Sequence, residues 1–347
     1  MRVTLKDVAE KSGYSYATVS RVIANQDNVS EKARRRILNV LEELDYGGFE
    51  SKKAPEPAQR TADPSRTVLV ICENIENPFY DQQITCVLTS LRREGYHVIL
   101  GPTKDSEEEE VYYIRYGIEQ NVAGMVFITI SDTEQIRSLL RQVQCPVILL
   151  NRYIRSMEYD AVIIDNYHGG YTAGKYLTEL QHTDIFHVAG PALSTASSDR
   201  TSGFADALHD AGVKFDEDDI FYGSLDMQSG MVAARVFLEK PRHYTAVFCG
   251  NLLMGRGFYE VLIEEHVNVP EDVSMICFDE DFGMQGMGPV RFTVIGRDAS
   301  AMGAMAAKLL LERMKGERSE ICKIIYAPQM TENNSCKMQL KPILKND

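Results

Sequence analysis

The sequence predicts an α/β protein in which a small helical unit precedes two doubly wound α/β subdomains. Three observations support this fold class. Residues 4–44 show three short stretches with the apolar spacing of helices. From Thr67 onward, short apolar runs alternate with amphipathic stretches, which is typical of parallel sheets covered by helices on both faces. Between these parts lies a segment rich in Gly, Pro and Lys. We therefore expect a first domain at 1–50, a linker at 51–66 and a second domain at 67–339.

The helical unit has the pattern of a helix-turn-helix. Residues 4–10 have the spacing of one helix with Thr4 as its N-cap, and a second helix follows Ser15. Gly13, between them, tolerates the positive φ that a tight turn requires. A third helix, from Ser30 to about residue 44, presents an apolar face that can close the small core. In a helix-turn-helix the second helix enters the major groove of DNA.

The second helix should divide into a buried face and a DNA-facing one. Val19 and Val22 lie three residues apart and share the inner face. Arg34, Arg35 and Arg36 of the third helix could contact phosphates or form a solvated basic face. The candidate DNA-binding residues are Thr4, Lys6, Ser15, Tyr16, Ala17, Thr18, Ser20, Arg21 and Asn25.

The charge of the chain is unevenly distributed. The 347 residues carry a net charge of −13, whereas residues 1–40 contain eight Lys or Arg against four Asp or Glu, which is +4 and leaves −17 for the remainder. A basic head on an acidic body fits a protein whose DNA contact is limited to one module. The seven cysteines have no metal-ligand spacing and indicate reduced, buried thiols. Without a long apolar run or a signal core, we expect a cytoplasmic protein with no membrane contact.

The second domain should contain two sets of alternating strands and helices. The first set has strands at 68–72, 97–100, 125–129 and 147–150 with helices at 81–94, 107–120 and 134–142. The second begins near 162–164 and has helices at 169–180, 199–211, 229–239 and 253–265 and strands at 185–188, 246–249 and 274–278. Segments 292–295, 299–315 and 321–326 should cross back to complete the first sheet. The expected subdomains are about 67–164 plus 294–325, and about 165–293 plus 326–339.

Three segments of the helical unit resemble the N-terminal signature of the LacI/GalR family of bacterial repressors. They are residues 4–9 (Thr-Leu-Lys-Asp-Val-Ala), 17–22 (Ala-Thr-Val-Ser-Arg-Val) and 29–31 (Val-Ser-Glu). The resemblance implies a repressor that binds a pseudo-palindromic DNA operator as a homodimer. It also implies that the α/β domain resembles a periplasmic sugar-binding protein and holds a small-molecule effector, such as a sugar or sugar phosphate. Only 11 residues follow Cys336, fewer than a tetramerising coiled coil needs, so we expect dimers.

The resemblance also identifies candidate effector-binding residues near the carboxyl ends of strands, where open α/β sheets bind ligands. Arg200 matches the family's effector-binding arginine, and a guanidinium can fork two acceptors. The full set is Phe79, Tyr80, Asn151, Ser194, Arg200, Leu225, Asn251 and Leu252. Asp279, in a segment that resembles a family motif at the seam of the two subdomains, is expected to be structural.

The sequence departs from the family at three places. Leu252 occupies the place of an aspartate that grips sugar hydroxyls, and Leu225 that of an aromatic residue in several members. The linker also lacks the leucine of the family's hinge helix, while Gly47, Gly48 and Pro55 disfavour a helix there. Two functions therefore remain open, a regulator controlled by a small molecule and one whose degenerate effector site responds to a protein partner or to nothing.

An enzyme fused to a DNA-binding head is a third possibility, which the motifs do not favour. The sequence has no Gly-x-Ser-x-Gly elbow, no P-loop, and no Gly-x-Gly-x-x-Gly that opens a helix after a strand. His168 and His187 have no nucleophile in their sequence context. Glu107 to Glu110 start a helix, where the helix dipole favours acids without a metal. We expect no catalysis, no cofactor and no metal.

Overall fold

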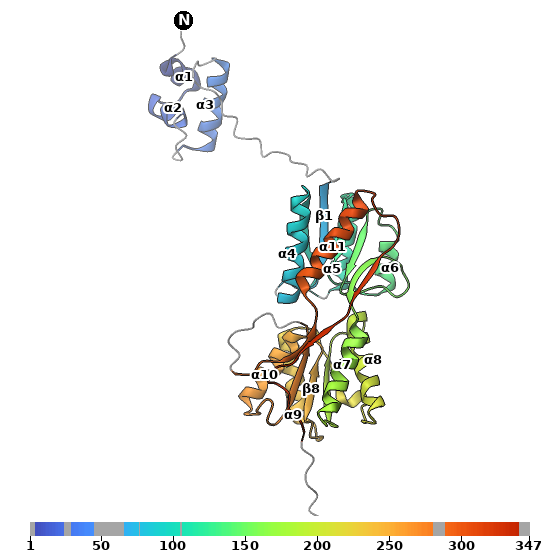
Figure 1. Cartoon of the computed structure of the whole chain (residues 1–347). Coiled ribbons are helices and arrows are strands. Elements are labelled where there is room, and N and C mark those ends of the chain that lie inside the picture. Colours follow the sequence, from blue (N-terminus) through green and yellow to red (C-terminus); the bar gives the residue numbers. More distant parts are fainter. Residues whose placement is uncertain are drawn as a thin grey trace, which may run out of the picture. The chain divides into compact units, whose positions relative to one another are not determined.

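A computed structural model describes residues 4–23, 29–44, 66–75, 77–104, 106–279 and 289–339. The chain divides into two compact units, a helical one within residues 1–61 and an α/β one within residues 62–347 (Figure 1). Asn25 and most of the predicted linker lie outside the described residues.

The helical unit consists of α1 (Leu5–Ser12), α2 (Tyr16–Ile23) and α3 (Glu31–Glu43). Thr4 begins α1, and both its backbone N–H and its hydroxyl donate to the Asp7 carboxylate at 2.7 Å. Gly13 ends α1 with φ of 77°, the left-handed conformation that the turn required. The buried core contains Val8, Val19, Val22, Ile37, Val40 and Leu41. The predicted helix-turn-helix with a third closing helix is therefore present.

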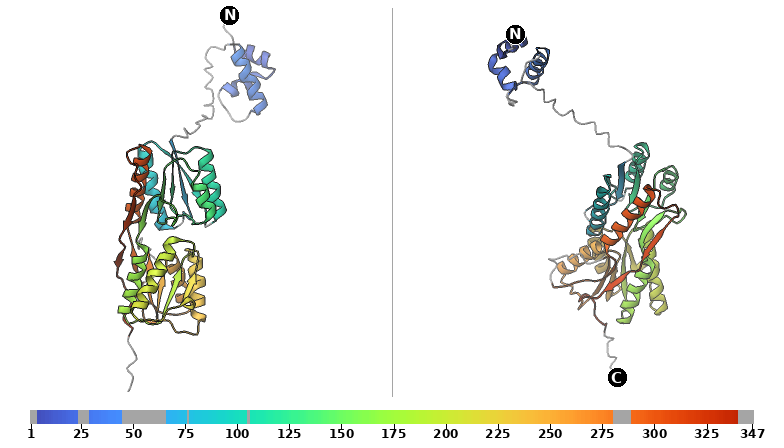
Figure 2. Two further views of the ribbon diagram at one scale, coloured as in Figure 1. Left: turned by 90° about the vertical axis from the view of Figure 1, so that its right-hand side faces the viewer. Right: turned by 45° about the horizontal axis from the view of Figure 1, so that its top comes forward.

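The first lobe of the α/β unit is a parallel sheet of six strands in the order β11-β5-β4-β3-β1-β2. Helices α4 and α11 pack against each other and cover one face, while α5 and α6 cover the other (Figure 2). The strands are β1 (Thr67–Cys72), β2 (His97–Pro102), β3 (Gly124–Phe127), β4 (Val147–Leu150), β5 (Asp160–Ile164) and β11 (Lys323–Tyr326). The helices are α4 (Pro78–Arg93), α5 (Glu107–Glu119), α6 (Glu134–Leu140) and α11 (Ala299–Met314).

The second lobe is a sheet of six strands in the order β12-β10-β9-β8-β6-β7, parallel except for the β10–β12 pair. Its helices form two packed pairs, α7 with α8 and α9 with α10. The strands are β6 (Ile185–Ala189), β7 (Ile220–Tyr222), β8 (Ala246–Cys249), β9 (Ser274–Phe278), β10 (Thr293–Gly296) and β12 (Gln329–Thr331). The helices are α7 (Asn166–Glu179), α8 (Thr195–Asp210), α9 (Met227–Glu239) and α10 (Leu252–Glu264).

The expected return of the chain to the first sheet is only partly correct. Strand β10 belongs to the second sheet, because Val294 and Ile295 pair in parallel register with Cys277 and Phe278 of β9. The chain returns to the first lobe through α11 and β11. Strand β5, with which the sequence pattern began the second set although the expected first subdomain extended to residue 164, pairs with β4 and β11 of the first sheet. Apolar runs of four or five residues fit either sheet, so the pattern alone could not assign these strands.

Several helices begin earlier than predicted, and for α4 and α8 the caps explain the difference. Asn77 caps α4 by accepting from the Phe79 N–H at 3.0 Å, with Pro78 at the first helical position. Ser194 caps α8 by accepting from the Ser197 N–H at 3.4 Å. Strand β7 was not predicted. The seven cysteines are free, but only Cys72, Cys249 and Cys277 are buried, so the expectation of buried thiols holds for these three.

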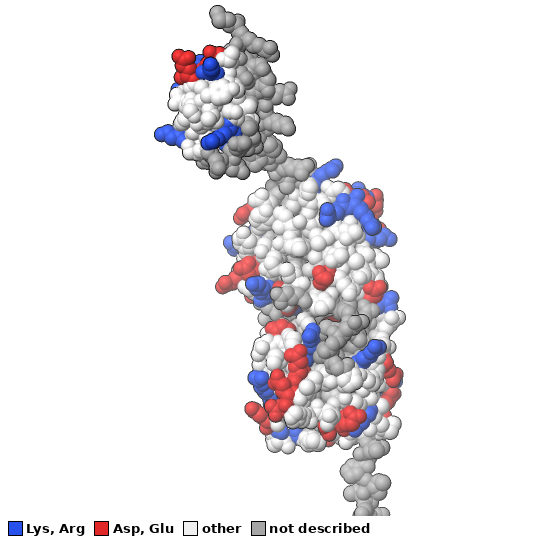
Figure 3. Space-filling model, turned by 90° about the vertical axis from the view of Figure 1, so that its left-hand side faces the viewer, with Lys and Arg blue, Asp and Glu red and all other residues white. Residues whose placement is uncertain are grey.

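The surface of the α/β unit differs between its two ends. Acidic side chains gather on the second lobe in the view of Figure 3, and basic ones lie at the opposite end of the first lobe. No helix within the described residues is long and apolar enough to span a bilayer.

Candidate effector cleft and DNA-contacting surface

The carboxyl ends of the two sheets enclose one small cavity between the lobes. Its volume is about 20 Å³. The first lobe contributes Phe79, Tyr80, Asn151 and Arg152, and the second contributes Ser194, Ala196, Ser197, Arg200, Leu225, Asn251 and Asp279. Seven of the eight predicted effector-binding residues thus line the same cavity. A space of this size accommodates about one water molecule, so a larger ligand requires the lobes or their side chains to move apart.

Arg200, on α8, is one of two buried arginines that line the cavity. Its Nε donates to Asn166 Oδ1 at 2.9 Å and its Nη1 to the Gly250 carbonyl at 2.5 Å. Burial lowers the pKa of this guanidinium, and it raises the pKa of the nearby Asp279 carboxyl. Nη2 lies 4.0 Å from Asp279 Oδ1, beyond a hydrogen bond, so the cavity presents a donor and an acceptor side by side.

A second ion pair supports the first-lobe wall. Arg152 lies two residues beyond the end of β4, and its Nη2 donates to Glu73 Oε2 at 2.6 Å. Both side chains are buried, at 6% and 7% exposure. Each cation of the cavity therefore faces a carboxylate, and the wall carries little net charge.

Asn151 and Gln83 form a reciprocal amide pair inside the first lobe. Gln83 Nε2 donates to Asn151 Oδ1 at 2.8 Å, and Asn151 Nδ2 donates back to Gln83 Oε1 at 2.7 Å. Asn151 Nδ2 also donates to the Ile128 carbonyl at 3.0 Å. Both amide hydrogens of Asn151 are thus used internally, which leaves one lone pair of Oδ1 to accept from a ligand.

Asn251 fixes the loop that carries Leu225. It caps α10 by accepting from the Met254 N–H at 2.8 Å, and its Nδ2 donates to the Leu225 carbonyl at 2.7 Å. Leu225 has a positive φ of 57°, an uncommon conformation for a leucine. Leu252 does not line the cavity. Its side chain is buried in the core cluster of the second lobe, while its backbone N–H bonds to the Asp279 carboxylate.

A larger hollow of about 220 Å³ adjoins the inner cavity. Tyr80 and Leu225 line both spaces and so form the wall between them. The remaining lining residues are Glu73, Asn74, Asn77, Lys104, Ser224 and Asp226. Burial raises the pKa of Tyr80, so its phenol remains a protonated donor at neutral pH.

Sequence reasoning undervalued two charged residues of the cavity. Asp279 was expected to be structural, and Arg152, which follows Asn151 in the chain, was left out of the effector-binding set. The signal that could have identified both is their position immediately beyond the carboxyl end of a buried strand. Gln83 carries no such signal, because it lies inside α4 and acts through Asn151.

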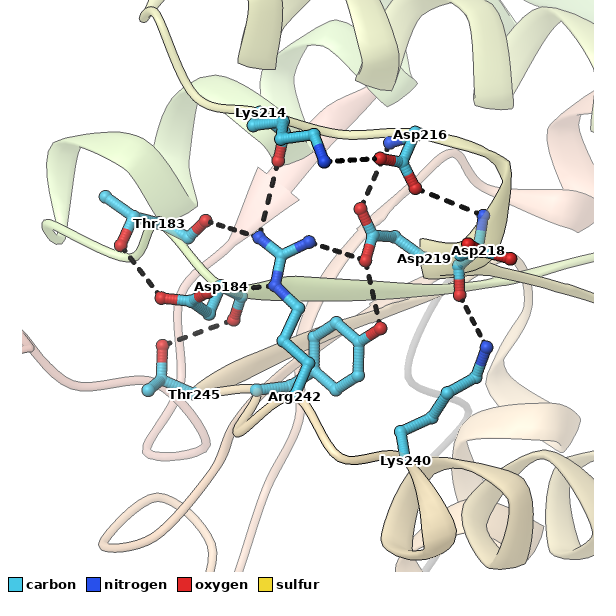
Figure 4. Close-up of polar contacts among 10 residues, drawn as sticks. Thr183, Asp184, Lys214, Asp216, Asp218, Asp219, Lys240, Arg242 and Thr245 are labelled. Carbon is cyan, nitrogen blue, oxygen red and sulfur yellow. Dashed lines mark hydrogen bonds and ion pairs between the residues drawn. The ribbon is translucent and has the colours of Figure 1, made fainter.

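A dense polar network in the second lobe is separate from the cavity (Figure 4). Arg242 bridges Asp184, at 2.9 Å from Nε, and Asp219, at 2.6 Å from Nη1. The Tyr244 hydroxyl donates to the same Asp219 oxygen at 2.9 Å. Because these donors and carboxylates satisfy one another, the network joins the segments around β6, β7 and β8 and offers no ligand site.

The second helix of the helical unit separates its side chains as predicted. Val19 and Val22 are buried, whereas Tyr16, Ala17, Ser20 and Arg21 are exposed. The hydroxyls of Ser15 and Thr18 lie 2.8 Å apart, and the Thr18 N–H donates to Ser15 Oγ at 3.2 Å. Lys6 of α1 is exposed as well. The candidate residues of α2 therefore form an exposed polar surface that includes the cation Arg21, and a single helix of this kind fits into a DNA major groove.

The fold and the cavity define a class of protein in which a helix-turn-helix is joined to a two-lobed small-molecule-binding domain. The chain belongs to the LacI family of bacterial regulatory proteins. The sequence-family model described as "Bacterial regulatory proteins, lacI family" matches residues 4–47. The family model described as "Periplasmic binding proteins and sugar binding domain of LacI family" matches residues 65–331. The chain is therefore a DNA-binding transcription regulator with an effector-binding domain.

Related bacterial regulators match this chain over nearly its full length. The chain is 30% identical over 337 residues to the HTH-type transcriptional repressor PurR of Vibrio atlanticus (strain LGP32), covering 96% of this chain and 98% of that protein. It is 27% identical to the HTH-type transcriptional regulator DegA of Bacillus subtilis (strain 168), with the same coverages. Among solved structures, the complex of the transcriptional regulator CelR with cellobiose matches at 29% identity and a TM-score of 0.71, covering 96% of this chain and 100% of that one.

Proposed function

We propose that this regulator is a repressor that binds a pseudo-palindromic operator as a homodimer, and that an uncharged, hydrogen-bonding small molecule between the lobes controls its DNA affinity. The carrying observation is the side-by-side placement of Arg200 and Asp279 in the interlobe cavity. A ligand group with adjacent acceptor and donor atoms, such as the hydroxyl of a sugar or an amide-like ring edge, matches this pair.

The charge balance of the cavity favours a neutral ligand over a sugar phosphate. Arg152 is paired with Glu73, and Arg200 faces Asp279. A phosphate would have to compete with a buried carboxylate for each guanidinium, and it would leave that carboxylate without its counter-charge. Tyr80 and Phe79 supply apolar surface on which a sugar ring or a heterocycle can pack.

The proposed DNA contact rests on the exposed side of α2. Tyr16 and Ala17 would select bases, and Arg21 would contact a base edge or a phosphate. One helical head of this size reads a short half-site, so two heads related by a twofold axis account for a pseudo-palindromic operator. Contacts to the DNA sugar-phosphate backbone around the groove would come from Thr4, Lys6, Ser15, Thr18 and Ser20.

A second candidate function is regulation without a small molecule. Leu225 and Leu252 replace groups with which related cavities grip ligands, and Asn151 and Asn251 use their amides internally. In that case the cavity would be part of a permanently closed core, and a protein partner or expression level alone would set repression.

Thermal unfolding with a panel of sugars, sugar phosphates and nucleosides separates the two candidates. A true effector at 100 times its Kd should stabilise the α/β unit by about 2.7 kcal/mol. We expect a neutral compound to stabilise the wild type and to lose this effect in Arg200→Lys. If only phosphorylated compounds act, the charge argument is wrong. If no compound acts while operator binding is intact, the effector-independent function is favoured.

A further inference from the structure

Three exposed arginines lie at the amino-terminal edge of the first sheet. Arg92 and Arg93 are the last two residues of α4, and Arg66 directly precedes β1. The Arg66 Nη1 atom lies 3.4 Å from the position that a Cβ would take at Gly95, in the turn that follows α4. The three arginines therefore flank one turn, at the end of the unit where Figure 3 shows basic side chains.

The neighbouring acids do not neutralise these arginines. Within the described residues, none of the three has a carboxylate at salt-bridge distance, whereas Glu94 pairs with Lys315 and Glu312 with Arg318, each at 2.8 Å. Thr85 and Thr89 add exposed hydroxyls on the same helix and line a shallow hollow with Arg92 and Arg93. The edge is thus a local basic surface on a part of the chain that is acidic as a whole.

We propose that Arg66, Arg92 and Arg93 form a second DNA-contacting surface, which binds backbone phosphates of the DNA held by the helical unit. This inference rests on the proposed operator binding. Guanidinium forks match phosphate oxygens, and arginine and threonine side chains are common phosphate contacts. The chain enters the α/β unit at Arg66, so this edge is tied by residues 45–65 to the helical unit. The tether raises the effective concentration of bound DNA at this edge.

A charge-matched pair of variants tests the surface in the full-length chain. Arg92→Gln/Arg93→Gln removes two charges from the edge, and Arg115→Gln/Arg235→Gln removes two exposed charges from α5 and α9. The probe is a fluorescent duplex that the wild-type chain has selected from random DNA. Its affinity is measured by anisotropy between about 50 and 200 mM NaCl, because each lost phosphate contact lowers the slope of log K against log salt by about 0.9.

We expect the slope for Arg92→Gln/Arg93→Gln to be about 1.8 units shallower than for the wild type, so that the loss of affinity over this salt range shrinks about tenfold. The control should keep the wild-type slope. Equal flattening in both variants, or in neither, would overturn the proposal. A changed oligomeric mass of Arg92→Gln/Arg93→Gln in light scattering would also overturn it, since the arginines would then contact protein. If the wild type selects no DNA, the proposed function itself fails.

Discussion

The guanidinium of Arg200 lies over the ring of Phe278, 3.6 Å from the ring centroid. The ring holds the planar cation from one face, while Asn166 and the Gly250 carbonyl bind its Nε and Nη1 atoms. Only the Nη2 side is directed toward Asp279 across a gap of 4.0 Å. Asn166 begins α7 and Phe278 ends β9. A ligand that shifts the Arg200 guanidinium would therefore disturb its contacts with two elements of the second lobe at once.

The first prediction concerns this buried cation. Arg200→Ala leaves the Asp279 carboxylate buried beside an empty position, so unfolding of the α/β unit should become easier by about 3–5 kcal/mol. Arg200→Lys keeps a charge but cannot fork, and should cost about 1.5–3 kcal/mol. Urea titration measures both changes. The control is Arg155→Ala, an exposed arginine whose partner Asp199 lies 3.7 Å away, with an expected loss below about 1 kcal/mol. Equal losses at Arg155 and Arg200 would contradict the assigned role.

A second prediction concerns His187, a buried histidine stacked on Phe248 with 4.8 Å between ring centroids. Nδ1 lies 2.9 Å from the Phe248 carbonyl and must donate to it, so Nε2 accepts from the Thr201 hydroxyl at 3.0 Å. Burial lowers the pKa of His187 to about 4, from 6.5. Between these values the unfolded chain binds a proton that the folded chain does not, so stability should fall as the pH falls from 6.5 to 4.

The loss attributable to His187 should be about 3 kcal/mol between pH 7 and pH 4. His187→Gln will lower stability at pH 7, but its stability should depend less steeply on pH than that of the wild type. Urea unfolding of the α/β unit at several pH values gives both slopes. His209→Gln, at an exposed histidine, is the control for the loss of one histidine from the chain. A parallel pH dependence of His187→Gln and wild type would contradict the prediction, because it would mean that the pKa of His187 is the same in the folded and unfolded chains.

The sequence predicts the α/β architecture better than it predicts the chemistry of the cavity. Periodicity located the central strands because each is a buried apolar run, but it missed the half-exposed β7 and β12. It also could not assign β10 to its sheet, since pairing with β9 depends on tertiary contacts. The sequence pattern also could not show that the Asn151 amide donates both of its hydrogens to Gln83 and Ile128, which are 68 and 23 residues away in sequence. Leu252, which lies one residue before the predicted helix at 253–265, is the first residue of α10, and its side chain turns into the core.

The third prediction concerns base contacts of the helical unit. Arg21 is exposed on α2 beside the buried Val22, so Arg21→Ala should weaken operator binding by about 1–3 kcal/mol without unfolding the unit. If Arg21 contacts a base, the loss should be larger on the operator than on random DNA. If it contacts phosphate, both duplexes should lose alike. Lys32→Ala, an exposed lysine of α3, is the charge-matched control in the same anisotropy assay. Unchanged operator affinity of Arg21→Ala would contradict the assignment of α2 as the recognition helix.

The last prediction concerns the linker, where residues 45–65 lie outside the described part of the chain. In the family, a hinge leucine wedges between central base pairs and bends the DNA, and its extra contacts offset an unstacking cost of a few kcal/mol. Residues 47–60 of this chain contain no leucine but include Phe49, two glycines, two prolines and the pair Lys52-Lys53. We expect this segment to bind mainly through charge, so that the operator is bent less and its central base pairs matter less.

Three substitutions separate the electrostatic linker from an aromatic wedge. Lys52→Ala and Lys53→Ala should each flatten the salt dependence of operator affinity by about one unit if the lysine reaches a phosphate. Phe49→Ala should leave DNA bending, measured by fluorescence energy transfer, unchanged. If bending instead collapses in Phe49→Ala alone, the aromatic ring does the work of the missing leucine, because partial unstacking by an inserted apolar side chain is what kinks the duplex. Lysine substitutions would then alter affinity but not the bend angle.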